Sequence, residues 1–234
     1  MGMNGKTANL VVALDFQTAN EALALAEKVR GVVPWMKVGL ELFTSEGPKI
    51  ISSLKDMEFK VFLDLKFHDI PNTVKGAAKA AAKLGADLTT IHHAGGKRMA
   101  EAALEGVKEA GYPTLVFAIS ILTSTSPEEA GFSSTAEVTE AIAAKGREAE
   151  IWGLPGLVCS GHEAAAVKAV CGPDFLCLCP GIRLDQNSAD DQRRVMTPAE
   201  AVRAGADFIV MGRPIARTAD PKGAASKALE NMLG

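Results

Sequence analysis

Residues 60–95 read KVFLDLKFHDIPNTVKGAAKAAAKLGADLTTIHHAG, and this stretch decides the fold. It begins with a short apolar run (60–67), continues with a segment that opens on Pro71 and closes on Gly85, and ends with a second apolar run at 87–95. Proline is favoured in the first turn of a helix, and glycine just after its last turn. The stretch therefore predicts a strand, a helix and a second strand, the unit from which parallel sheets are built.

The same alternation extends along the whole chain. The predicted strands are the eight apolar runs at 9–16, 35–43, 60–67, 87–95, 114–124, 156–161, 175–182 and 208–215. Predicted helices cover 18–31, 71–85, 134–146, 160–171, 197–205 and 221–233. No linker or low-complexity tract divides the chain, so we expect one domain over 1–234. Eight strand–helix units favour a closed (β/α)8 TIM barrel with its active site at the C-terminal ends of the strands. An open doubly wound sheet is disfavoured, because the first turn reads ALDFQTA and lacks a glycine-rich fingerprint.

Composition narrows the class of protein. The 234 residues carry 25 Lys and Arg against 28 Asp and Glu, so no basic footprint for nucleic acid is present. The apolar runs are too short to span a membrane, and the first residues lack the pattern of a signal peptide. We expect a soluble cytoplasmic protein. The pair Cys177 and Cys179 is interpreted as small core residues rather than metal ligands, because no second ligand pair accompanies it.

Several charged residues occupy inward positions of the predicted strands. One alternate set of residues in the third run is uniformly apolar and should face the helices, so Asp64 and Lys66 point into the barrel. The same test turns Asp15 and Lys37 inward, and Asp69 in the next loop can join them. Such charges are costly away from water unless they are paired. A purely structural salt-bridge network is the alternative, but a hydrophobic plug would close the barrel without that cost. We therefore favour a catalytic array.

The last two strands carry a different signal. The seventh run ends in PGIRLDQ and the eighth in MGRPI. Loops at these two positions often hold phosphate in such barrels. Gly212 lets the backbone approach an anion, Arg213 offers a bidentate donor, and Arg183 occupies the corresponding loop.

The segment DLKFHDIPNT (64–73) resembles the signature of the orotidine 5′-phosphate decarboxylase family. The segments ALDF, MKVGLELF, ILTS, PGIR, ADDQRRVMTP and VMGRPI resemble the family in the same order, from Asp15 to Arg213. The resemblance implies decarboxylation of orotidine 5′-phosphate to uridine 5′-phosphate and CO2, in de novo pyrimidine biosynthesis and without a cofactor or metal.

The resemblance also implies a catalytic role for four residues. Lys66 would donate a proton to C6 of the pyrimidine, and Asp64 would lie against the departing carboxylate. Lys37 and Asp69 would complete an alternating array of lysines and aspartates. Asp69 and Thr73 would come from the neighbouring subunit, so the implied working unit is a homodimer that binds a small nucleotide.

Further residues would bind the substrate. Asp15 and Lys37 would contact the ribose hydroxyls, and Thr123 the pyrimidine. Gln192 would bridge the base and the phosphate, within a lid at 182–192. The remaining implied phosphate contacts are Arg183, Gly212 and Arg213.

Electrostatics fits this chemistry. Loss of CO2 from C6 leaves a carbanion orthogonal to the π-system of the ring, so the ring offers no simple electron sink. A lysine ammonium close to C6 can stabilise that charge in a dry, preorganised pocket.

Three alternatives stay open. The first is a magnesium-dependent sugar-phosphate lyase similar to 3-keto-gulonate 6-phosphate decarboxylase, in which an acidic ligand replaces Lys37. The second is a Schiff-base aldolase that uses Lys66, and the third is a binding module for phosphate ligands. His68, His92 and His93 are interpreted as structural residues.

Overall fold

The computed structural model describes residues 8–184 and 195–234. Within these residues eight parallel strands pair in chain order, and β1 (Asn9–Ala13) pairs with both β2 (Trp35–Gly39) and β8 (Phe208–Met211). The sheet is therefore closed, and the predicted (β/α)8 barrel is confirmed. The other strands are β3 (Lys60–Phe67), β4 (Leu88–His92), β5 (Leu115–Ile119), β6 (Gly156–Val158) and β7 (Leu176–Cys179).

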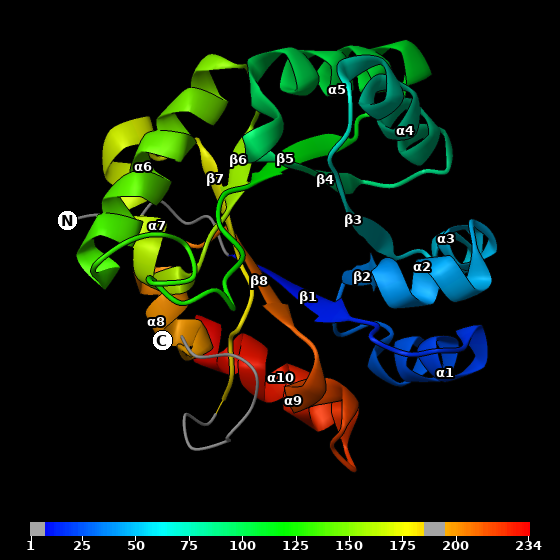
Figure 1. Ribbon diagram of the computed structural model, residues 1–234. Coiled ribbons are helices and arrows are strands. Elements are labelled where there is room, and N and C mark those ends of the chain that lie inside the picture. Colours follow the sequence, from blue (N-terminus) through cyan, green and yellow to red (C-terminus); the bar gives the residue numbers. More distant parts are fainter. Residues whose placement is uncertain (1–7, 185–194) are drawn as a thin grey trace.

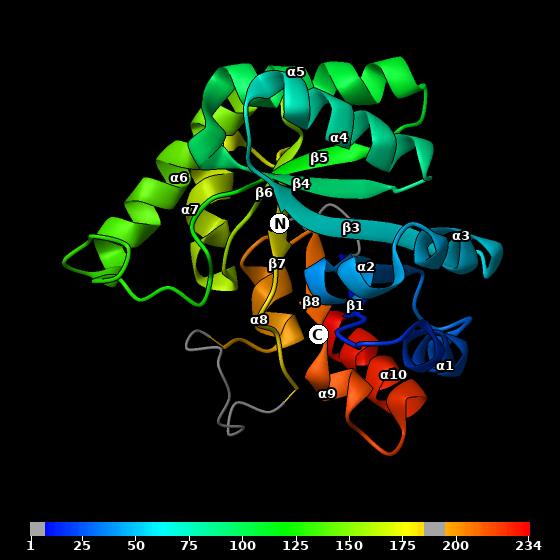
Figure 2. The ribbon, with the colours of Figure 1, turned by 45° about the vertical axis from the view of Figure 1, so that its right-hand side comes forward.

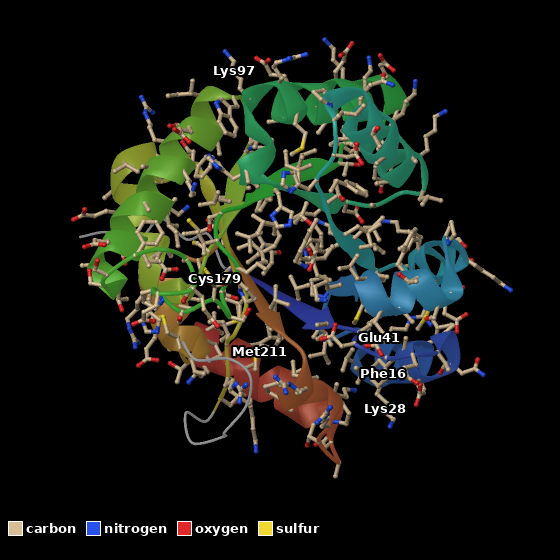
Figure 3. The ribbon with its side chains drawn as sticks, viewed as in Figure 1. Phe16, Lys28, Glu41, Lys97, Cys179 and Met211 are labelled. Carbon is tan, nitrogen blue, oxygen red and sulfur yellow. The ribbon has the colours of Figure 1, made fainter. Side chains whose placement is uncertain are left out.

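Helices surround the strands in chain order (Figure 1), and the same order is visible in a second view (Figure 2). Figure 3 shows the lysine side chains of Lys28 and Lys97 at the outer rim of this ring. The helices are α1 (Ala19–Val29), α2 (Leu40–Glu46), α3 (Lys49–Asp56), α4 (Pro71–Lys83), α5 (Gly96–Ala110), α6 (Thr135–Ile151), α7 (Gly161–Cys171), α8 (Pro198–Arg203), α9 (Arg213–Ala216) and α10 (Pro221–Met232), with a 3-10 turn, η1 (His93–Gly95), before α5.

Every strand except β3 is shorter than the apolar run that predicted it, and in the second and eighth runs the remaining residues begin the next helix. Residues 40–43 belong to α2 and not to the second strand, because pairing with β3 ends at Gly39. Leu42 is buried as part of this helix, which explains why the run stays apolar after Gly39. Leu40, in the same helix, is 55% exposed. Residues 213–215 likewise form α9 rather than the end of the eighth strand.

Side chains of the strands fall into two packed layers, as the alternation predicts. Met36, Val38, Val61 and Leu63 pack in the layer between strands and helices. The other alternate set fills the barrel interior and consists of Val11, Ala13, Trp35, Phe62, Leu88, Phe117, Ile119, Val158, Leu178, Phe208 and Val210. This plug fills the lower barrel and leaves the charged positions of β2 and β3 at its upper end.

At the base of the barrel, Asp87 joins three elements just before β4. Its Oδ2 accepts hydrogen bonds from Lys55 Nζ and from the Val61 N–H, both at 2.7 Å, and its Oδ1 accepts one from the Tyr112 hydroxyl at 3.1 Å. The preceding Gly85 has a φ of 84°, a conformation that favours glycine. Helix α3, strand β3 and the segment after α5 therefore all bond to one carboxylate.

Asp207 repeats this arrangement just before β8. Its Oδ2 accepts hydrogen bonds from Lys168 Nζ at 2.7 Å and from the Cys177 N–H at 2.8 Å. Gly205, with a φ of 101°, precedes it by the same two positions. The sequence Gly-Ala-Asp occurs at both places, 85–87 and 205–207. In each half of the barrel, the aspartate of this sequence accepts hydrogen bonds from a lysine and from the backbone of the preceding strand.

Candidate active site

A cavity of about 310 Å3 lies at the C-terminal ends of the strands. Strands β2 and β3 and the segment just after β1 contribute charged residues to its lining, and the segments after β5, β7 and β8 contribute polar and basic ones. The predicted site residues that line it are Asp15, Lys37, Asp64, Lys66, Thr123, Arg183, Gly212 and Arg213. One cavity therefore brings together the charge array and the predicted phosphate contacts.

The centre of the site is an ion pair on β3. Lys66 Nζ lies 2.7 Å from Asp64 Oδ2. Asp64 is only 8% exposed, and its second oxygen, Oδ1, accepts a hydrogen bond from the Thr90 hydroxyl at 2.9 Å. A partly buried carboxylate with both oxygens engaged is held in a single orientation. The ammonium group of Lys66 is therefore held at the cavity wall.

The backbone of Lys66 departs from regular strand geometry. Its φ is 52°, in the left-handed region that residues with a side chain rarely adopt, at a cost of roughly 1–2 kcal/mol. The register between β3 and β4 shifts between Leu63 and Phe67, which is the mark of a bulge or irregularity. Bulges beside active sites redirect a side chain. Strain at this position is consistent with a functional role for Lys66.

A second ion pair lies on the neighbouring strands. Lys37 Nζ is 3.0 Å from Asp15 Oδ1, and the Lys37 carbonyl accepts a hydrogen bond from the N–H of Leu14, the residue before Asp15, at 2.9 Å. The side chain and the backbone of Lys37 therefore both bond to the segment at the end of β1. A Cβ on Gly39 would lie 2.9 Å from Lys37 Nζ. The glycine therefore leaves the room that the lysine occupies.

The segments that follow β7 and β8 bring the basic residues to the cavity. Arg183 is 4% exposed, and its backbone N–H donates to the Met196 carbonyl at 3.0 Å. Arg213 begins the short helix α9, which follows Gly212 directly. A Cβ on Gly212 would lie 3.3 Å from Asp15 Oδ2, so a larger residue would press on that carboxylate. A short extra helix after the eighth strand is a frequent phosphate site in these barrels.

Two predicted residues within the described ranges, Asp69 and Thr73, do not line the cavity. Asp69 and Thr73 are exposed at the start of α4, and Asp69 Oδ1 accepts a hydrogen bond from the Ile70 N–H at 2.6 Å. Gln192 and most of the predicted lid at 182–192 lie outside the described residues.

The histidines near β4 occupy different environments. His92 lies at the end of β4, with its ring 5.2 Å from that of His68. Burial, followed by the charges of His68 and Lys66, lowers the pKa of His92. His93 is buried and stacks on Trp152 at 4.6 Å, and burial lowers its pKa too. These positions agree with the structural interpretation of His93 and place His92 beside the charged site.

Thr90 contacts two of the predicted site residues and was not itself predicted. It lies on β4, is fully buried, and contacts both Asp64 and the backbone of Lys66. The alternation that turns Asp64 inward also turns Leu88, Thr90 and His92 inward, so the signal was present in the 87–95 run.

The described residues contain neither a membrane-spanning helix nor a cluster of metal ligands. None of their helices is long and apolar enough to cross a membrane. In the ranges 8–184 and 195–234, no group of three or more His, Cys, Asp or Glu residues is arranged to hold a metal ion.

The closed parallel barrel, with paired charges and basic residues around one cavity at the carboxyl ends of its strands, defines a (β/α)8-barrel enzyme. The chain belongs to the orotidine 5′-phosphate decarboxylase / HUMPS family, whose model matches residues 8–228. The family resemblance of the sequence is confirmed.

Individual relatives agree with this assignment. The chain is 50% identical to an orotidine 5′-phosphate decarboxylase of Nitratidesulfovibrio vulgaris (strain DP4), over 96% of this chain and 97% of the relative. It is 51% identical to one from Maridesulfovibrio salexigens, over 96% and 99%. The crystal structure of orotidine 5′-phosphate decarboxylase from Lactobacillus acidophilus superposes with a TM-score of 0.85 at 34% identity, and covers 97% of this chain and 100% of that one.

Proposed function

We propose that this chain decarboxylates orotidine 5′-phosphate to uridine 5′-phosphate and CO2, as a step of pyrimidine biosynthesis. The observation that carries the proposal is the Asp64–Lys66 pair, 2.7 Å apart, in a cavity that Arg183 and Arg213 also line. Membership of the family supports the same reaction. A cytoplasmic location, expected from the composition, stays a prediction.

Lys66 is the proposed proton donor. When the bond from C6 to the carboxylate breaks, CO2 leaves and the electron pair stays on C6 as a carbanion. The Lys66 ammonium stabilises this charge and then transfers a proton to C6, which gives the product. The neutral amine then takes a proton from solvent before the next turnover. No metal or organic cofactor takes part in this proposal.

Asp64 has a different proposed role. Because its carboxylate is held beside Lys66, it would lie against the carboxylate of the bound substrate. Repulsion between the two groups is relieved when neutral CO2 departs, whereas the attraction between Lys66 and the reacting carbon grows. Lys37, 3.0 Å from Asp15, completes the array on the adjacent strand.

Binding of the nucleotide is assigned to the rest of the cavity. Asp15 and Lys37 would contact the ribose hydroxyls, and Thr123 the pyrimidine. Arg183, Arg213 and the Gly212 backbone would hold the phosphate, with Gln192 between phosphate and base. Because the phosphate does not react, its binding energy is available to orient the reacting carbon.

A homodimer is part of the proposal. Asp69 and Thr73 would enter the site of the partner subunit, which agrees with their exposed position outside the cavity of their own chain. The neighbouring Ile70 is 67% exposed, which is unusual for a large aliphatic residue and suits a contact surface.

Subunit mixing tests the shared site. Homodimers of Lys66→Ala and of Asp69→Ala should both be nearly inactive. After their subunits are exchanged, one site of each hybrid has both residues, so activity should return to about a quarter of the wild-type value for random mixing. Verified hybrids without recovered activity would place Asp69 in the site of its own subunit.

The reaction itself is tested by the loss of orotidylate absorbance with purified protein, with and without EDTA. We expect turnover that the chelator leaves unchanged. Turnover that EDTA abolishes and magnesium restores would favour the sugar-phosphate lyase. Trapping of substrate on Lys66 by borohydride would favour the aldolase, and tight nucleotide binding without CO2 release would leave a binding module.

A further inference from the structure

We propose that Thr90 is a positioning residue of this site: its hydroxyl holds the Asp64 carboxylate and the backbone of Lys66 in the arrangement that the reaction needs. The inference rests on the proposed function, because it assigns the hydroxyl a part in the same decarboxylation. Thr90 contributes no charge and is not in the lining of the cavity. It would act through the two residues that it contacts.

One hydroxyl makes both contacts. Thr90 Oγ1 accepts a hydrogen bond from the Lys66 N–H at 3.1 Å and donates one to Asp64 Oδ1 at 2.9 Å. A hydroxyl has a single proton, and the Lys66 N–H can only donate. The hydroxyl proton is therefore committed to Asp64. Because Thr90 has no exposed surface, water does not compete for either bond.

These bonds hold the two parts on which the ion pair depends, the carboxylate of Asp64 and the backbone of Lys66. Asp64 Oδ2 meets Lys66 Nζ at 2.7 Å only while the carboxylate keeps its rotation, and the bond to Oδ1 sets that rotation. Lys66 has its positive φ at the place where the β3–β4 register shifts, and there its N–H donates to a side chain of β4. The hydroxyl therefore supports the strained backbone and the carboxylate together.

Thr89 provides a matched control. It is the next residue on β4, it is equally buried, and its Oγ1 also donates to β3, to the Leu63 carbonyl at 2.9 Å. Because neighbouring residues of a strand point to opposite faces, Thr89 faces the helices and Thr90 faces the site. Thr89→Val and Thr90→Val each delete one buried hydroxyl that bonds to the same strand.

The test measures decarboxylation and thermal unfolding of Thr90→Val, Thr90→Ser and Thr89→Val. Thr90→Val should lower kcat by about 10- to 100-fold, because a small misplacement of reacting groups has effects of this size. Its KM for orotidylate should stay within about threefold, since the phosphate contacts are untouched. Thr90→Ser, which keeps the oxygen, should restore kcat to within about threefold of wild type. Thr89→Val should lower Tm by a similar amount to Thr90→Val but leave kcat unchanged.

Crystal structures of the same variants separate this proposal from the proposed function. In Thr90→Val the Asp64 carboxylate should rotate away from Lys66 Nζ, whereas in Thr89→Val the pair should stay intact. A Thr90→Val enzyme with wild-type kcat, or with an unchanged Asp64–Lys66 pair, would overturn the positioning role. An inactive wild type would instead contradict the proposed function, and the comparison of structures would still decide whether Thr90 positions the pair.

Discussion

A lysine–aspartate ion pair is present at each end of the barrel, but the two pairs have different roles. At the base, Lys168 Nζ lies 2.7 Å from Asp207 Oδ2, and at the mouth Lys66 Nζ lies 2.7 Å from Asp64 Oδ2. The base pair joins α7 to the residue before β8, and the lysine also donates to the carbonyls of Pro173 and Phe175. Each charge there is satisfied by the protein itself.

The mouth pair differs in what surrounds it. Asp64 and Lys66 both line the cavity, they lie two residues apart on one strand, and Lys66 has a strained backbone. The ion pair itself joins no distant elements, so the attraction between its two charges adds little to the stability of the fold. An equal distance between charges therefore does not indicate an equal role; the difference lies in what else each charged group contacts.

The largest expected effect is the loss of activity in Asp64→Ala. Deletion of a charge that acts on the reacting group should lower kcat/KM by about 10³-fold or more. The Tm should fall less than the activity does: the cavity gives water access to the Lys66 ammonium group that is left behind, and the main loss to the fold is the hydrogen bond from the buried Thr90 hydroxyl. Steady-state kinetics and thermal unfolding followed by circular dichroism measure the two quantities. A large fall in Tm with retained activity would reverse the roles assigned to the two ends.

Arg213→Ala tests whether, at the mouth of the barrel, phosphate binding and the reaction depend on different residues. Loss of a charge-assisted contact to phosphate should raise the KM for orotidylate by about 100-fold. The nucleoside orotidine, which has no phosphate, should be affected much less. Competition by uridine 5′-phosphate and by uridine gives the same comparison without turnover. Equal weakening of both ligands would show that Arg213 does not contact the phosphate.

Asp207→Ala is the counterpart of Asp64→Ala at the base. Lys168 and the Cys177 N–H would both lose an acceptor in a largely buried site, which should lower the free energy of unfolding by about 2–4 kcal/mol. For a domain of this size the Tm would fall by about 5–15 °C. At a temperature where the variant is folded, kcat should equal that of wild type. A kcat reduced tenfold in folded protein would contradict a purely structural base.

The smallest expected effect is on stability, and it concerns two ion pairs of Glu109 that lie at neither end of the barrel. On the outer surface, Lys75 Nζ and Lys79 Nζ both lie 2.7 Å from the Glu109 carboxylate, and they lower the pKa of Glu109 to about 2. The folded pKa is below the ordinary value of 4.5, so the stabilisation is complete above that value and is lost as the pH falls toward 2. Screening by water keeps the effect small.

Urea unfolding of wild type and Glu109→Gln at several pH values measures this contribution. Wild type should be slightly more stable at pH 6, and the gap should narrow as the pH falls below about 4.5. A gap that grows on acidification would show that Glu109 has no lowered pKa in the folded protein.

The period of the strands made most of the site predictable. Because side chains alternate across a strand, the single apolar face of 60–67 was enough to turn Asp64 and Lys66 inward. The same argument holds for Lys37, between the outward Met36 and Val38. Arg183 and Arg213 were predictable from the ends of the last two strands.

Other features depend on contacts that no single segment contains. The positive φ of Lys66 arises where the register of β3 against β4 shifts, which requires both strands. The end of a strand is also not visible when the next helix begins with apolar residues. Residues 40–43 were therefore predicted as strand although they begin α2. The base sites were missed for a different reason. The repeated Gly-Ala-Asp at 85–87 and 205–207 is visible in the sequence, but its lysine partners lie more than thirty residues away.

The most direct test of the account is decarboxylation by Lys66→Ala, measured beside its affinity for uridine 5′-phosphate. Removal of the proton donor should abolish detectable loss of orotidylate absorbance, while the Kd for uridine 5′-phosphate stays within about tenfold of wild type, because the phosphate and ribose contacts are made by other residues. Turnover by Lys66→Ala within tenfold of the wild-type rate would contradict the account, because the charge on β3 would then not drive the reaction.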